Sequence, residues 1–144
     1  MSEIQNDYYS IAVNDYLFLE AALHTGLYNQ ITVQCQQIAE KLLKSVAEEV
    51  CTIQIEDLLK SHNLKKIYLG INSEFSSFQL DTRNMSYLKD FYFDAKYPGE
   101  NFSVVTRQEC ELCLSIMYDV FDEVNNFRHM HAQWVHPFTR QPIS

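Results

Sequence analysis

The stretch VQCQQIAEKLLKSV, residues 33–46, decides the fold class of this chain. Its hydrophobic residues recur every three or four positions and fall on one side of a helix: Cys35, Ile38, Ala39, Leu42 and Val46. Its polar residues fall on the other side: Gln36, Gln37, Glu40, Lys41 and Lys44. The pattern predicts a long helix over about residues 28–50, with one face in a hydrophobic core and the other in solvent.

Outward from this stretch, the same spacing recurs in four more segments. It predicts helices over about 4–24, from Ser61 or His62 to about 71, over 81–97 and over 104–127. Gly26 ends the first helix, the β-branched segment 51–55 interrupts the second, and residues 72–80 form a loop held by two phenylalanines. Asp81 is a plausible N-cap. We therefore predict an all-α, up-and-down antiparallel bundle of four to five helices.

The composition fits a single domain. The chain has 144 residues, 47% of them hydrophobic, with only three glycines and three prolines, which favours helices over a β fold with many turns. No apolar run reaches the roughly 20 residues of a membrane span, and the N-terminus lacks a secretory pattern. We expect a cytoplasmic protein with no membrane association, whose four cysteines are reduced thiols.

Charge is unevenly distributed along the chain. The net charge of −8 argues against broad, sequence-independent binding of nucleic acid. Residues 128–144 are the exception, because they contain basic and histidine side chains without any acid. We therefore expect two parts, a helical bundle over 1–127 and a C-terminal tail over 128–144. Nine tyrosines and nine phenylalanines exceed what one small core hides, so a second copy is the simplest partner.

Five short motifs appear in order along the chain: NDY at 14–16, GLY at 26–28, QQIAEKLLK at 36–44, SHNL at 61–64 and AKYPG at 95–99. Together they resemble the HEPN family over about residues 5–127. The resemblance implies a helical bundle that commonly dimerises. It also implies association with a nucleotidyltransferase in a toxin-antitoxin-like pair, metal-independent ribonuclease activity, or nucleotide binding. The family usually has Arg where Lys96 stands, and Lys lacks the planar fork of Arg.

The ribonucleases of that family carry an arginine and a histidine separated by four to six residues, and this sequence lacks the pair. After Arg107, the corresponding positions hold Leu112, Cys113 and Leu114; after Arg83 they hold Leu88, Lys89 and Asp90. Arg128 has His131 too near and His136 too far. Arginine stabilises phosphate charge and histidine transfers protons near neutral pH, so the standard nuclease geometry is missing.

A polar groove is the predicted ligand site, where a nucleotide or an RNA end would bind. It comprises Asp15, Gln36, Glu40, Lys44, His62 and Lys96. Structural roles compete with this interpretation. Asp15 would find a partner within the bundle, and His62 would cap or hydrogen-bond the start of its helix.

Cys110 and Cys113 form a CxxC pair on the hydrophobic side of the last helix, without a second pair or a suitably spaced histidine pair. They are therefore assigned to the core, and no metal or cofactor is expected. The tail mixes aromatic and cationic residues, which suits single-stranded RNA. The alternative is that Trp134 and Phe138 dock on the bundle or on a second subunit.

Three functions follow. The first is a dimeric, catalytically degenerate HEPN protein that binds nucleotides or RNA or partners a nucleotidyltransferase. The second is a metal-independent ribonuclease that uses a non-standard arrangement of Arg128 with His131 or His136. The third is a purely structural dimeric scaffold that binds no ligand.

Overall fold

The computed structural model describes residues 6–100 and 102–130, and in these segments all regular structure is helical. Six α-helices and one short 3-10 helix follow in order: α1 (Tyr8–Ala22), η1 (Leu23–Thr25), α2 (Tyr28–Val50), α3 (Ile55–Lys60), α4 (Leu64–Glu74), α5 (Thr82–Lys96) and α6 (Arg107–Met130). The prediction of an all-α bundle is confirmed. None of the described helices is both long and apolar enough to cross a lipid bilayer.

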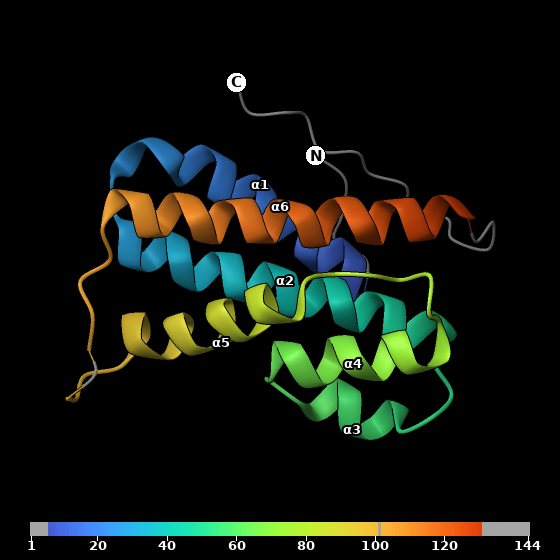
Figure 1. Ribbon diagram of the computed structural model, residues 1–144. Coiled ribbons are helices and arrows are strands. Elements are labelled where there is room, and N and C mark those ends of the chain that lie inside the picture. The colour runs from blue at the N-terminus through green and yellow to red at the C-terminus, as the bar shows by residue number, and fades with distance from the viewer. Residues whose placement is uncertain (1–5, 101, 131–144) are drawn as a thin grey trace.

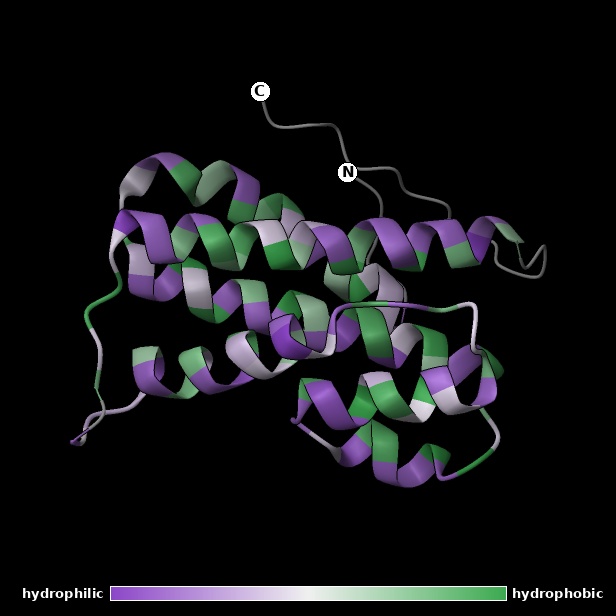
Figure 2. Ribbon diagram, viewed as in Figure 1, coloured by the Kyte–Doolittle hydropathy of each residue, from purple (hydrophilic) through white to green (hydrophobic). Residues whose placement is uncertain are grey.

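Helix α2 is the centre of the bundle and contacts α1, α3, α4, α5 and α6. Figure 1 shows α1 and α5 running in one direction and α2 and α6 in the other. Hydrophobic residues form stripes on each helix in Figure 2, and they meet in one core. All five positions predicted to face inward on α2 are buried, as are Leu64, Ile67, Tyr68 and Ile71 on α4.

The helix ends follow local capping chemistry. The Asp7 side chain accepts a hydrogen bond from the Ser10 amide at 2.9 Å, and Asp81 accepts from the Arg83 amide at 2.8 Å. The predicted N-cap Asp81 is therefore confirmed. Gly26, with φ of 70°, occupies the left-handed region that ends the η1 turn.

The structure differs from the sequence prediction in four places. The segment after α2 forms the short helix α3, which the sequence did not predict, and Asn63 rather than His62 caps α4. The first helix begins at Tyr8, and α6 continues to Met130. Helix α3 has only six residues, too few to be stable alone, so its packing against α2 and α4 sustains it.

Aromatic pairs join the distant parts of the core. Tyr16 of α1 meets Phe121 of α6 edge to face, with ring centroids 5.1 Å apart. Phe75 and Phe78, from the segment between α4 and α5, both pack against Phe127 with centroids 5.5 Å apart. The prediction that two phenylalanines hold this loop is confirmed.

Candidate functional site

A polar network lies halfway along α2, where three side chains repeat every four residues. Glu40 is its centre: one carboxylate oxygen accepts from Gln36 Nε2 at 3.2 Å, and the other accepts from Lys44 Nζ at 3.1 Å. His62, from the connection between α3 and α4, places its Nδ1 3.2 Å from Glu40 Oε2. The structure thus brings together four of the six residues predicted for the ligand groove.

The network is buried on one side and open on the other. Gln36 is 1% exposed and Lys44 4% exposed, whereas the His62 side chain is 82% exposed. The expectation that Gln36 and Lys44 face solvent is wrong, because the central position of α2 covers its polar side as well. A buried ion pair costs desolvation energy that its attraction only partly offsets, so the pair of Glu40 and Lys44 adds little net stability over apolar side chains of similar size.

His62 is the member of this network that can meet a ligand. With a proton on Nδ1, the ring donates to Glu40 and leaves Nε2 facing away as an acceptor; when protonated, the ring also donates from Nε2. A carboxylate behind a histidine fixes the orientation of its ring. The arrangement can therefore present a directed hydrogen-bonding group, and in the charged form a cation, to an anionic group.

The other two predicted groove residues lie apart from this network. Asp15 forms an ion pair with Lys41 between α1 and α2. Lys96, at the end of α5, donates to the Tyr92 hydroxyl at 2.9 Å and lies over the rings of Tyr92 and Tyr97. The hydrogen bond that it donates to Tyr92 raises the pKa of the Lys96 ammonium. Within the described residues, neither Asp15 nor Lys96 forms a hydrogen bond or an ion pair with Gln36, Glu40, Lys44 or His62.

Arg128, the arginine of the ribonuclease alternative, is part of the bundle. It is 7% exposed in α6, and its guanidinium carbon lies 3.7 Å from the centre of the Tyr9 ring. Burial lowers the pKa of its guanidinium. Arg128 of α6 thus packs on Tyr9 of α1 and helps to hold these two helices together. His131 and His136 lie outside the described residues.

The cysteine pair is buried as expected. Cys110 and Cys113 lie on α6 facing Cys35 of α2, and all three are free thiols. Burial raises the pKa of Cys113 to about 12, which keeps its thiol protonated and unreactive. Within residues 6–100 and 102–130, no group of three histidine, cysteine or acidic side chains could hold a metal ion.

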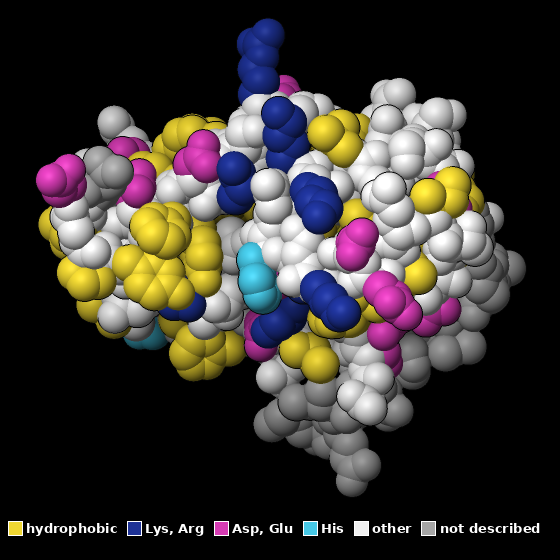
Figure 3. Space-filling view, turned by 90° about the horizontal axis from the view of Figure 1, so that it is seen from below, with side chains coloured by type: hydrophobic (Ala, Val, Ile, Leu, Met, Phe, Trp, Pro, Cys, Tyr) yellow, Lys and Arg dark blue, Asp and Glu magenta, His cyan; other side chains and the backbone are white. Residues whose placement is uncertain are grey.

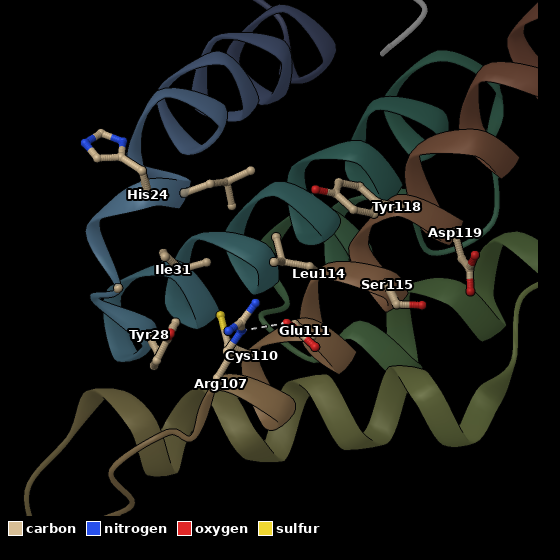
Figure 4. Close-up of a pocket in the computed structure, with 12 residues that line it drawn as sticks. His24, Tyr28, Ile31, Arg107, Cys110, Glu111, Leu114, Ser115, Tyr118 and Asp119 are labelled. Carbon is tan, nitrogen blue, oxygen red and sulfur yellow. Dashed lines mark hydrogen bonds and ion pairs between the residues drawn. The ribbon is translucent and has the colours of Figure 1, made fainter. Parts of the chain in front are cut away.

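A cavity of about 750 Å³ opens between η1, the start of α2 and the start of α6. Figure 4 shows Arg107 at its rim turned toward Glu111, while Leu114 and Tyr118 form part of its wall. The Arg107 Nε donates to Glu111 at 3.0 Å, and Asp119 adds a second carboxylate. Because the one arginine is paired with an acid and another acid lies nearby, this cavity does not favour an anionic nucleotide.

Sequence reasoning missed a cluster of lysines around His62. Lys60, Lys65 and Lys66 are exposed at the end of α3 and the start of α4. In the part of the chain that the structure describes, these three ammonium groups form no ion pair. Their closeness in sequence was the available signal: KSHNLKK at 60–66 holds three lysines and a histidine without an acid.

Comparison with known proteins gives one result. The HEPN domain family matches residues 5–127, which is most of the chain. No curated protein and no solved structure matches it. The five motifs, the helical bundle and this match over 5–127 agree, and the chain belongs to the HEPN domain family.

Proposed function

We propose that this protein is a catalytically degenerate HEPN module that binds RNA or nucleotides without cleaving them. One observation carries the proposal. Arg107 begins α6, but the positions where the ribonucleases of the family have histidine hold Leu112, Cys113 and Leu114. Cys113 is fully buried, and leucine cannot transfer a proton, so no acid–base group follows Arg107 at the required separation.

The anionic character of the ligand is supported by the surroundings of His62. Its ring is held by Glu40 and is accompanied by three exposed lysines, in a chain whose net charge is −8. A local concentration of positive charge in an acidic protein favours phosphate groups at that place and disfavours them elsewhere.

The proposal extends to assembly. Exposed hydrophobic side chains gather near one end of the bundle, among them Phe18, Leu27, Phe102 and Val104. Such residues support a homodimer, and the family resemblance supports a nucleotidyltransferase as the second partner in a toxin-antitoxin-like pair. The four free thiols fit the reducing cytoplasm. Sedimentation velocity tests the dimer, and co-purification with a nucleotidyltransferase encoded beside this chain tests the second partner.

The test of the central proposal uses the purified full chain and a fluorescently labelled single-stranded RNA in EDTA. We expect a salt-dependent rise in anisotropy and intact RNA on a denaturing gel. Cleavage that disappears in His131→Ala or His136→Ala would establish the ribonuclease alternative instead. Absence of any RNA or nucleotide binding would refute the proposal.

A further inference from the structure

The face formed by α3, α4 and α5 combines positive charge with exposed aromatic rings. Figure 3 views the molecule from this side, where lysine and arginine side chains surround a histidine and adjoin a hydrophobic patch. Lys60, Lys65 and Lys66 supply charge from α3 and α4. We call these three residues the lysine cluster; their ammonium groups have no ion pair within the described residues.

The hydrophobic part of this face comes from α5. Phe93 is 61% exposed and Tyr97 is 43% exposed, and their ring centroids lie 5.0 Å apart. They follow Lys89 at intervals of four residues, so all three lie on the same side of the helix. We call Phe93 and Tyr97 the aromatic pair. Lys96 lies with its ammonium 5.3 Å from the Tyr97 ring centre and adds a cation to this pair.

Helix stability does not explain either feature. Lys65 and Lys66 are in the first turn of α4, where the helix dipole disfavours cations. Phe93 and Tyr97 remain largely exposed for aromatic side chains and are not part of the hydrophobic core cluster of the described residues. Both sets of side chains are placed where an external partner could use them.

We propose that this face binds single-stranded RNA, with phosphates on the lysine cluster and bases stacked on the aromatic pair. The inference rests on the proposed RNA-binding function and assigns it to one surface. His62, oriented by Glu40, lies beside the lysine cluster and, when both ring nitrogens carry a proton, donates from Nε2 to a phosphate oxygen. The partner is recognised by its charge and by its unpaired bases rather than by its sequence.

Two observations favour single-stranded RNA over other partners. Interfaces with proteins are enriched in arginine and depleted in lysine, whereas the charge of this cluster comes from lysine. Duplex RNA keeps its bases stacked inside the helix, so exposed aromatic rings would have no base to contact. A chain of phosphates with free bases matches both halves of the face.

The experiment compares matched variants of the full chain by anisotropy with a labelled single-stranded RNA of about 12 nucleotides. Phe93→Ala should weaken binding at least about fivefold, because each stacked base contributes about 1–3 kcal/mol. The control Leu17→Ala removes an apolar side chain from α1 that is 49% exposed and should change the affinity by less than twofold. Circular dichroism confirms that both variants fold.

A second pair of variants tests the charge. We plot the logarithm of the RNA association constant against the logarithm of the salt concentration. Lys66→Gln should reduce the steepness of this slope by about 0.7, the value for one phosphate contact to a single strand. Arg107→Gln removes an exposed cation from α6 and should leave that slope unchanged. A duplex of the same length should bind more weakly and should be insensitive to Phe93→Ala.

The outcomes separate this inference from the proposed function. If the wild-type chain binds single-stranded RNA but each variant behaves like its control, the surface is refuted and RNA binding stands. If duplex binds as well as single strand, the role of the aromatic pair is refuted. If the wild-type chain does not bind RNA, the inference falls together with that function.

Discussion

The polar side of α2 and the face formed by α3, α4 and α5 use the same residue types in opposite ways. On α2, Lys44 is 4% exposed and pairs with Glu40. On the other face, Lys65 and Lys66 are exposed and have no ion pair in the described part of the chain. The difference teaches that burial, rather than residue type, determines whether a lysine is held by an internal partner or stays exposed to solvent.

The largest effect is expected where the α2 network loses its carboxylate. Glu40→Ala leaves the buried Lys44 ammonium without its partner, and we expect a loss of about 3–5 kcal/mol in the free energy of unfolding. Urea denaturation measures it. The control Glu111→Ala breaks the exposed pair with Arg107, whose side chain is 76% exposed, and should cost less than about 1 kcal/mol.

A double replacement examines the same network further. Glu40→Leu with Lys44→Met should recover much of the loss, because apolar side chains often replace a buried ion pair at little cost. A double variant less stable than Glu40→Ala would contradict this account of the network.

The second prediction concerns the packing that supports the lysine cluster. A Cβ on Gly70 of α4 would lie 2.6 Å from Cδ2 of Leu58, which is buried in α3. Gly70→Ala should therefore destabilise the protein by about 1 kcal/mol, since overpacking costs about 1–3 kcal/mol and better helix propensity returns about 1 kcal/mol. Urea denaturation measures the change. A Gly70→Ala variant more stable than wild type would show that α3 moves aside freely.

A third and smaller effect is expected at the lysine cluster itself. Replacing Lys65 and Lys66 with Gln should leave the free energy of unfolding unchanged or raise it by up to about 1 kcal/mol, because cations are removed from the first turn of α4. Thermal denaturation at low salt measures it. Loss of stability in this variant would mean that the two lysines have a structural role, as Lys44 does.

The smallest effect is expected at Glu74, which holds the connection between α2 and α3. Its carboxylate accepts from the Thr52 and Ile53 amides, and these hydrogen bonds lower the pKa of Glu74 below its ordinary value of 4.5. A lowered folded-state pKa gives stability that is present above pH 4.5 and is lost as pH falls through the folded pKa. The free energy of unfolding of the wild-type chain should therefore exceed that of Glu74→Gln at neutral pH, and this difference should shrink as the pH falls through the folded-state pKa. A difference independent of pH would contradict this assignment.

Much of the fold could be predicted because helix periodicity is local. The buried face of α2 follows from the spacing of residues within that one helix: Ile31, Cys35, Ile38, Leu42 and Val46. The Asp81 cap is equally local, because its side chain accepts from amides two and three residues further along the chain. Helix α3 could not be predicted in this way. Its six residues depend on Leu58 packing into the core and on Glu74 holding the segment before it.

The site was predicted less completely. Gln36, Glu40, Lys44 and His62 do come together, because the first three are four residues apart on α2 and His62 is brought to them by the turn after α3. Asp15 and Lys96 pair instead with Lys41 and Tyr92, and these contacts could not be read from the sequence because they depend on how α1 packs on α2 and how α5 ends.

The sequence by itself determined five of the six α-helices, their hydrophobic faces and the membership in the HEPN domain family, because these depend on residues close together in the chain. Only the tertiary structure decided that Lys44 and Arg128 are buried while the lysine cluster and the aromatic pair face solvent. The exposure of a polar side chain depends on which other helices cover it, and that information is spread over the whole chain.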